Sequence, residues 1–420
     1  MEFKEFKDLL FKKALNNGFE ECEVYFANRE SIAISVYEQE LEKYNINTTF
    51  GLSFRGKING KIGYSYTEIL DEEAIDMLIK NAKEGANSIE NNDVQFIYEG
   101  DKEYQKVICY SDELENLNTE KLINLALEME KESKKYSKKV VNLGGCSIGY
   151  GNSEYGIFNT KGLELVNKSN LLTAYVVPIV EDNNEKYDGT GYVTALKLDE
   201  VNPKNIAKQG VEEALSRIGG RSIPSGKYKA ILYNEAMVSL LGTFCGIFDA
   251  DAAQKGLSLL KDKEGEIIAS DVVNIVDDPL LDNGLSSTPF DDEGVATYKK
   301  EIVFKGELKT LLHNLKTAYK AGCKSTGNGF KSGVMSPVSI SPTNLYIEKG
   351  EKSLEELIKE VGEGILITDL AGLHSGANSI TGDFSLAAKG FYIKDGKIFR
   401  IVAENEDDHS VAADETIDCS

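Results

Sequence analysis

The sequence predicts an α+β protein of two domains: an N-terminal domain of helices and antiparallel strands over residues 1–220, and a C-terminal, mostly antiparallel β domain with few helices over residues 221–420. Three observations lead to this fold class. The chain of 420 residues is longer than one typical core requires. Helical and two-residue hydrophobic periods alternate along the first half, whereas turns and short strands dominate the second. Gly219-Gly220, followed by Pro224-Ser225-Gly226, marks the boundary.

The first sixty or so residues predict a helix followed by an antiparallel meander. Apolar residues recur at helical spacing over 3–14, and Gly18 follows where a left-handed cap is expected. Apolar and polar residues then alternate over 22–26 and 32–36, as they do in half-buried strands. Asn59-Gly60 predicts a tight hairpin, because this pair tolerates the positive φ angles of such a turn.

The remaining elements follow from the same periodicities. Further helices are predicted over 74–86, 122–129, 206–218 and 354–360, and further strands over 140–143, 171–181 and 192–196. A buried strand at 231–232 is expected to run directly into a helix. Ser353 and Glu356 fit a capping box, and Asp395-Gly396 predicts another hairpin.

Composition indicates a soluble protein that does not bind nucleic acid. The formal charge of −22 and the pI near 4.7 leave no basic surface for phosphate. The six cysteines are dispersed, as is typical of reduced thiols, and Cys245 and Cys323 are expected to be buried and inert. The N-terminus lacks a secretory pattern, and no apolar stretch reaches a membrane-spanning length. We therefore expect a cytoplasmic protein.

Asn234, Glu235 and Ser239 form a degenerate version of the zinc motif H-E-x-x-x-H. Zinc takes nitrogen, thiolate or carboxylate ligands, so an amide and a hydroxyl in the two histidine positions predict that no metal binds there. Glu235 occupies the position of the general base without a metal-bound water to activate. The alternative is that these residues are only an ordinary helix start.

Other candidate sites are weaker. His313, His374 and His409 lie too far apart in sequence for a helical zinc motif, although a mixed carboxylate and histidine site stays open. His374, Asp383 and Ser385 resemble a hydrolase triad but lack a G-x-S-x-G elbow. A glycine-bearing turn that shapes a peptide groove is the other functional interpretation of this segment.

Two further motifs are explained more simply by turns. The acids that could bind calcium or magnesium have no EF-hand spacing; they are Asp277, Asp278, Asp291, Asp292 and Glu293. The glycine-rich run Ser325 to Gly329 lacks the Gly-Lys-Ser/Thr ending of a phosphate-binding loop. The sequence therefore predicts neither a metal site nor a nucleotide site at these positions.

Many short motifs, in order, resemble the TldD/PmbA metallopeptidase family, and more specifically its TldE/PmbA branch. At the C-terminal end these are His374 to Ser385, Gly390 and the hairpin over 393–398. Upstream they are Gly256 to Leu259, Gly265-Glu266, Asp277 to Pro279, Phe290 to Gly294 and Ser325 to Asn328. Near the N-terminus they are Glu23 to Tyr25, Gly51 to Arg55 and Gly60 to Gly63. The resemblance covers roughly residues 10 to 400 and ends after Val402, so the tail is expected to be short for the family.

The resemblance implies a subunit of a cytosolic complex that degrades or trims unfolded or modified peptides. In the TldD/PmbA family the TldD branch carries H-E-x-x-x-H and binds zinc. The TldE branch lacks these zinc ligands and pairs with a TldD subunit. Asn234 and Ser239 fall at the histidine positions, so the partner is expected to be a TldD-like sister that holds the zinc. Candidate residues for a peptide groove or an interface are His374, Ser375, Gly376, Asn378, Gly382, Asp383 and Ser385.

Two alternatives stay open at this point. The chain could be a self-sufficient metallopeptidase with an unconventional metal site. It could instead be a non-enzymatic peptide-binding protein that acts alone as a homodimer.

Overall fold

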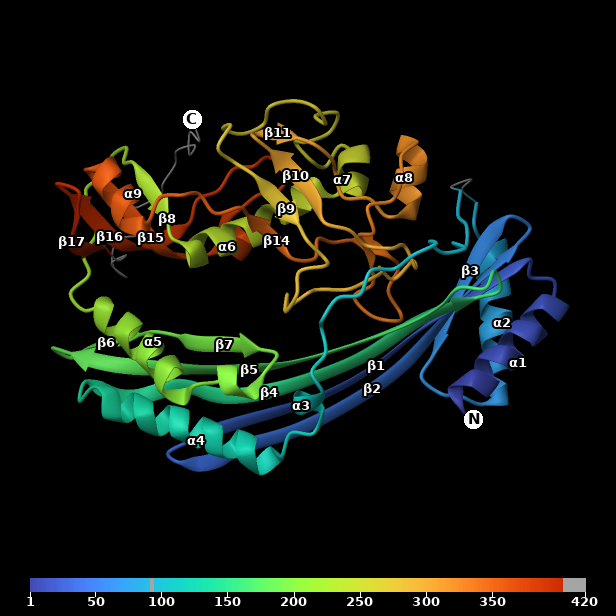
Figure 1. Cartoon of the computed structure of the whole chain (residues 1–420), viewed down its shortest axis with the longest axis horizontal. Helices are drawn as coiled ribbons and strands as arrows, with labels where there is room; N and C mark the ends of the chain where they lie inside the picture. The colour runs from blue at the N-terminus through green and yellow to red at the C-terminus, as the bar shows by residue number, and fades with distance from the viewer. Residues whose placement is uncertain (91–93, 403–420) are drawn as a thin grey trace.

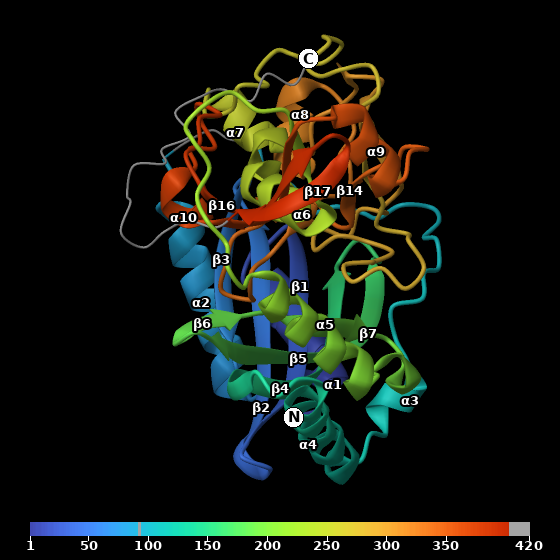
Figure 2. The ribbon, with the colours of Figure 1, turned by 90° about the vertical axis from the view of Figure 1, so that its left-hand side faces the viewer.

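The computed structural model describes residues 1–90 and 94–402. Figure 1 shows a long, curved sheet from the first half of the chain, with the second half lying over its concave side. The view in Figure 2 shows the same two layers, the second half above and the sheet with its helices below. The predicted α+β class is confirmed.

The first unit is built around one antiparallel sheet of the order β3-β2-β1-β4-β5-β6, with β7 also paired to β5. Its elements are α1 (Phe3–Asn16), β1 (Glu21–Tyr37), β2 (Glu40–Ile58), β3 (Lys61–Thr67), α2 (Glu72–Asn87), α3 (Asp112–Glu115), α4 (Thr119–Tyr136), β4 (Val140–Asn159), β5 (Glu164–Asp182), β6 (Glu185–Asp188), β7 (Gly191–Ala195) and α5 (Pro203–Ser216). The helix and meander predicted for the N-terminus are confirmed as α1 and β1 to β3.

The second unit contains smaller sheets, of the orders β11-β10-β9-β14, β12-β13 and β17-β16-β15-β8. Its elements are β8 (Ala230–Leu232), α6 (Asn234–Phe244), α7 (Ala250–Gln254), β9 (Ile275–Asp277), β10 (Lys300–Phe304), β11 (Glu307–Leu308), α8 (Leu315–Ala321), β12 (Gly329–Phe330), β13 (Ser339–Ile340), β14 (Leu345–Ile347), α9 (Leu354–Val361), β15 (Gly364–Ala371), α10 (Leu373–Gly376), β16 (Ala387–Lys394) and β17 (Lys397–Val402). The strands pair antiparallel except β8 and β15, which are parallel.

Local sequence signals place the turns and helix ends correctly. Gly18 has a φ of 93°, and the Asn59-Gly60 hairpin has φ values of 50° and 74°. The Ser353 side chain accepts a hydrogen bond from the Glu356 amide in the predicted capping box. These features depend only on neighbouring residues, which is why the sequence identifies them.

The convex face of the long sheet is covered by helices at its two ends. One core joins α1 and α2 to β1 and β2 and includes Phe6, Leu10 and Phe54. The other joins α4 and the start of α5 to the opposite end of the sheet and includes Met129 and Ile148. None of the helices in the described part of the chain combines the length and the apolarity needed to cross a membrane.

Two burial predictions are wrong. The strand at 231–232 is half-buried instead of buried, because among the described residues β15 is the one strand that pairs with β8. Cys323 is exposed and Cys245 is half-buried, because both lie near the ends of short helices and not in a core. The thiols of Cys22, Cys109 and Cys146 are buried and free, and burial raises the pKa of Cys22 and Cys146 to about 12.

Candidate functional site

Helix α6, which carries the degenerate zinc motif, is positioned by the parallel pair of β8 and β15. The Tyr233 amide donates to the Ile367 carbonyl at 2.8 Å, so the helix begins directly where this pairing ends. In Figures 1 and 2, α6 lies along the side of the second unit that faces the long sheet. The start of the helix is therefore fixed by backbone pairing and does not depend on its exposed side chains.

The motif residues on α6 present an amide, a carboxylate and a hydroxyl at the positions of H-E-x-x-x-H. Asn234 and Ser239 are exposed, and the Ser239 hydroxyl donates to the Glu235 carbonyl oxygen at 3.0 Å. Glu235 is half-buried, and its Oε2 atom has no hydrogen-bond partner within the described chain. Amide and hydroxyl oxygens bind zinc poorly. Across residues 1–90 and 94–402, no group of three or more His, Cys, Asp or Glu side chains could hold a metal ion.

The second candidate segment, residues 373–385, folds into a short hairpin-like loop. An isolated bridge joins Ala377 to Phe384, and the Asn378 amide donates to the Asp383 carbonyl at 2.8 Å. A Cβ atom on Gly376 would lie 2.2 Å from the Ser385 carbonyl oxygen, so only glycine allows this close approach. Gly382 has a φ of 79°, which also favours glycine. The loop conformation is therefore specified by its sequence.

This loop packs beside α6. The rings of Phe244, at the end of α6, and Phe384 lie 5.9 Å apart. The polar side chains of the loop point to solvent: those of His374, Ser375, Asn378, Asp383 and Ser385 are exposed. Among the described residues, no hydrogen bond joins His374 to Asp383 or Ser385, so the three do not form a triad. The structure thus brings the two candidate segments together as neighbouring surfaces.

The acidic and glycine-rich motifs meet in the interior of the second unit. Asp277 is fully buried and forms an ion pair with Lys300 at 3.1 Å. Its Oδ2 atom also accepts from the Asn328 side chain at 2.9 Å, and its Oδ1 atom accepts from the Thr343 amide at 2.7 Å. Asp277 therefore holds together the strand β9 and two loops, which is a structural role and not that of a metal ligand.

The neighbouring acid Asp291 holds the same glycine-rich run from another side. Its Oδ2 atom accepts from the Gly329 amide at 2.9 Å, and its Oδ1 atom accepts from the Val295 amide at 3.0 Å. Burial, and then repulsion from Glu293, raises the pKa of Asp291 well above its usual range. Asp291 thus fixes the turn that carries Asp292 and Glu293 toward the long sheet.

An inter-unit ion network joins the second unit to the long sheet; its members are Glu23, Arg55, Asp292, Glu293 and Lys331. On the sheet side, Arg55 Nε donates to Glu23 Oε1 at 2.7 Å. Glu23 is 1% exposed, and its Oε2 atom has no partner within the described chain. Opposite this pair, Glu293 accepts from the Leu315 amide at 2.7 Å. Burial raises the pKa of Glu293, and the charge of Arg55 opposes this effect.

Lys331 is the cation that the second unit contributes to this network. Its Nζ atom donates to the Ser53 hydroxyl at 3.0 Å and lies over the rings of Tyr25 and Tyr64, 4.7 Å and 5.3 Å from their centroids. Its backbone amide donates to Asp292 Oδ2 at 2.7 Å. Burial, and then repulsion from Arg55, lowers the pKa of Lys331 to about 8.

The titration of Lys331 predicts a pH-dependent stability. Its folded pKa of about 8 lies below the ordinary lysine value of about 10.4, so between these values the unfolded chain binds a proton that the folded chain lacks. Stability from this group therefore rises with pH across that window. The free energy of unfolding of wild type minus that of Lys331→Met should increase by about 3 kcal/mol from pH 7 to 10.5 in urea titrations. Ser53→Ala, which keeps the lysine, should retain the trend; a difference independent of pH would contradict the prediction.

No sequence pattern predicts this network. Glu23 and Arg55 lie in motifs that resemble the family, but the alternation of apolar and polar residues predicts that both face solvent. Lys331 follows the glycine-rich run and belongs to no recognisable sequence motif.

His313, one of the three histidines, is buried, and its Nδ1 atom lies 3.2 Å from the Thr317 hydroxyl oxygen. Burial lowers the pKa of His313. His409 and Cys419 lie outside the described residues.

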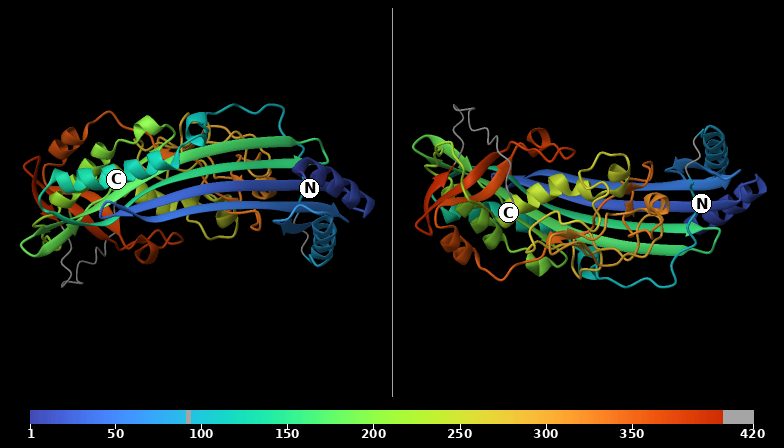
Figure 3. Two further views of the ribbon diagram at one scale, coloured as in Figure 1. Left: turned by 90° about the horizontal axis from the view of Figure 1, so that it is seen from below. Right: turned by 90° about the horizontal axis from the view of Figure 1, so that it is seen from above.

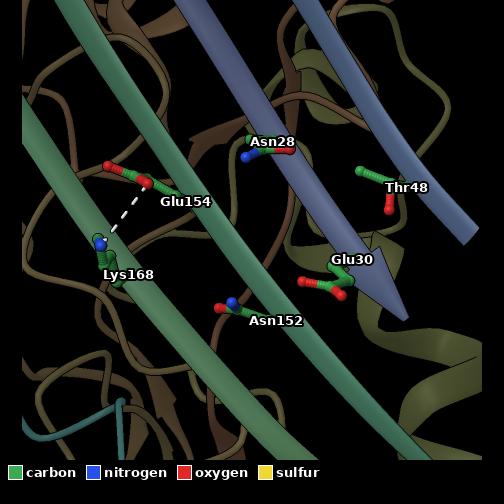
Figure 4. A pocket seen from close by; sticks show the side chains of 6 residues that line it. All are labelled: Asn28, Glu30, Thr48, Asn152, Glu154 and Lys168. Carbon is green, nitrogen blue, oxygen red and sulfur yellow. Dashed lines mark ion pairs between the residues drawn. The ribbon is translucent and has the colours of Figure 1, made fainter. Parts of the chain in front are cut away.

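A polar depression of about 60 Å³ lies in the middle of the convex face of the long sheet, between the helix-covered ends. It is lined by Asn28, Glu30, Thr48, Asn152, Glu154 and Lys168 (Figure 4). Glu154 and Lys168 form an ion pair at 3.7 Å. This volume holds a few water molecules and no peptide, so the depression is a solvated part of the sheet.

Comparison with known proteins agrees with this architecture. Three family models match successive parts of the chain: PmbA/TldA metallopeptidase domain 1 at residues 22–86, the central domain at 112–218 and the C-terminal domain at 225–406. The metalloprotease PmbA homolog of Buchnera aphidicola is 27% identical over 385 residues, which are 90% of this chain and 82% of the homolog. An uncharacterized protein of Methanocaldococcus jannaschii is 28% identical, over 93% of this chain and 89% of its own length.

Solved structures show the same fold. A proposed modulator of DNA gyrase from Thermotoga maritima is 36% identical, with a TM-score of 0.89, and the match covers 96% of this chain and 90% of that one. TldE from Thermococcus kodakarensis is 21% identical, with a TM-score of 0.81 over 94% of this chain and 90% of that one, and shows the fold alone. The chain is therefore a member of the PmbA/TldD metallopeptidase family.

Proposed function

We propose that this chain is a TldE/PmbA-type subunit that holds no zinc itself and works in the cytoplasm with a TldD-like sister carrying H-E-x-x-x-H. The proposal rests on the two residues of α6 that stand where H-E-x-x-x-H has its histidines. Asn234 and Ser239 offer an amide and a hydroxyl, and the Ser239 hydroxyl is already bonded to the helix backbone. In the complex, zinc bound by the sister supplies the activated water that peptide hydrolysis requires.

The contribution of this chain is to bind and orient the peptide. The proposed groove residues are His374, Ser375, Gly376, Asn378, Gly382, Asp383 and Ser385. The loop that contains them is held by its own backbone hydrogen bonds and exposes its polar side chains beside α6. An extended peptide bound by main-chain hydrogen bonds would be accepted with broad sequence tolerance, as trimming of unfolded or modified peptides requires.

The central test is a Glu235→Gln variant, co-expressed and purified with a sister from the same genome. If Glu235 has no metal-bound water to activate, peptidase activity should stay within about threefold of wild type. This change is far smaller than the loss of activity caused by removing a general base. The matched control is the same change in the glutamate of the sister's H-E-x-x-x-H, which should lower activity by ~100-fold or more. A comparable loss with Glu235→Gln would overturn the proposal.

Metal analysis separates this proposal from a self-sufficient metallopeptidase. The chain purified alone should contain zinc far below one equivalent and should not cleave peptides. Stoichiometric zinc, with cleavage that a chelator abolishes, would establish the alternative. The third possibility is a non-enzymatic peptide-binding protein. It would be favoured if the chain alone binds peptide and adding the sister leaves that affinity unchanged.

A further inference from the structure

Lys300, Asn328 and Asp277 form a closed triangle of hydrogen bonds in the interior of the second unit. Lys300 Nζ donates to Asn328 Oδ1 and to Asp277 Oδ2, both at 3.1 Å. The Asn328 side-chain nitrogen donates to the same Asp277 oxygen at 2.9 Å. Lys300 begins β10, and Asn328 directly precedes β12. The right view in Figure 3 shows this part of the chain, in yellow and orange, lying over the long sheet.

Burial favours the uncharged form of Lys300. Asp277 and Asn328 have no exposed surface, and Lys300 is 5% exposed. Transfer of one proton from Lys300 to Asp277 removes both charges from this buried site, which lowers the cost of desolvation. Burial also lowers the pKa of Lys300, although the charge of Asp277 opposes this effect. An uncharged, desolvated lysine amine is a nucleophile.

The side-chain carbon of Asn328 is placed to receive this amine. Because a C=O bond is ~1.2 Å long and Nζ lies 3.1 Å from Oδ1, the amide carbon is at most about 4.3 Å from Nζ. The Thr326 hydroxyl also donates to Asn328 Oδ1, at 2.8 Å. A donor in this position stabilises the negative charge that develops on the oxygen when an amine attacks the carbon. The site therefore contains a nucleophile, an electrophile and a donor for the oxyanion.

We propose that Lys300 and Asn328 become joined by an isopeptide bond with release of ammonia. The Lys300 Nζ atom forms a bond to the Asn328 side-chain carbon, and the bond from this carbon to Nδ2 breaks. Asp277 touches both nitrogens, so it takes a proton from Nζ and gives it to Nδ2. Of the two protons that Nζ loses, one converts the leaving group into ammonia, and the other leaves with it as ammonium. One amide replaces another, so the step requires no oxidant and no co-reactant.

The bond closes a covalent ring over residues 300–328 and fixes the start of β12 to β10. The run that follows Asn328 carries the backbone donors of two buried acids: the Gly329 amide donates to Asp291, and the Lys331 amide donates to Asp292. The cross-link thus stabilises the second unit's side of the inter-unit ion network, and it constrains the unfolded chain as a disulfide does. It is independent of the peptidase proposal, because it involves no residue of α6 or of the loop over 373–385.

Mass spectrometry of the purified, denatured chain tests the proposal. The main wild-type species should be lighter than its sequence by one ammonia. Trypsin should release peptide 300–305 joined to peptide 325–331, because acylation removes the lysine charge that trypsin recognises. A main species with the full mass of the sequence, or separate peptides in place of the joined pair, overturns the proposal.

Variants distinguish the isopeptide bond from cyclisation of Asn328 onto the backbone at Gly329, which also releases ammonia. Lys300→Met should have the full mass of its sequence, whereas Lys299→Met, the same change at the neighbouring exposed position, should keep the loss of ammonia. Asp277→Asn removes the group that moves the proton and should lower the linked fraction by about tenfold or more. Loss of ammonia that persists in Lys300→Met overturns the proposal. The joined peptides of wild type decide the question if a variant does not fold.

Discussion

Arg55→Met is expected to lower the free energy of unfolding by about 3–5 kcal/mol, because it leaves buried carboxylates without their cation. Glu23 is 1% exposed and accepts the Arg55 Nε hydrogen bond at 2.7 Å. Glu293, from the second unit, is 5% exposed and is also stabilised by the charge of Arg55. The change therefore affects the contact between the long sheet and the second unit. Urea unfolding, followed by far-UV circular dichroism, measures this loss of unfolding free energy.

Lys57→Met on the same strand is the matched control for Arg55→Met. Lys57 pairs with Glu21 at 3.6 Å in a partly exposed position, where an ion pair contributes at most about 1 kcal/mol. The double variant Glu23→Leu/Arg55→Met should recover part of the stability, because it removes the buried charge together with its partner. Equal losses from Arg55→Met and Lys57→Met would show that the inter-unit ion network does not hold the two units together.

Asp277→Ala is expected to have a comparable or larger effect, about 4 kcal/mol or more, within the second unit. Asp277 is fully buried and accepts from Lys300 Nζ at 3.1 Å and from the Asn328 side chain at 2.9 Å. It also accepts from the Thr343 amide and hydroxyl, both at 2.7 Å. Removing the carboxylate takes the acceptor away from these donors, and the buried Lys300 cation keeps the Asn328 Oδ1 atom as its side-chain acceptor.

The adjacent acid Asp278 is the control for Asp277→Ala. Its Oδ1 atom accepts from the Leu280 amide at 3.1 Å, and its ion pair with Lys299 is long, at 3.9 Å. Asp278→Ala should therefore cost about 1 kcal/mol, the value of one ordinary hydrogen bond. The midpoint of urea unfolding compares the two variants. Similar midpoints would contradict a special role for Asp277.

The sequence predicts the candidate segments on α6 and over 374–385 but not the buried ion network. The degenerate motif on α6 and the loop over 374–385 were identified separately, and the structure makes them neighbours through Phe244 and Phe384. The acids at 277 and 291 and the run from Ser325 were interpreted as turn formers. Asp291 does fix a turn, through the Glu293 and Val295 amides. These residues also meet in one hydrogen-bonded interior, and no local pattern encodes the meeting of residues so far apart in the chain.

The sequence by itself determined the elements whose signals are local: the amphipathic helices, the Asn59-Gly60 turn and the alternation of β1. Only the tertiary structure decided which faces of the strands are buried. Glu23 and Tyr25 occupy the polar positions of the alternation, yet they are 1% and 5% exposed, because the second unit covers their side of the sheet. Periodicity distinguishes the two faces of a strand but carries no information about distant residues that pack on them.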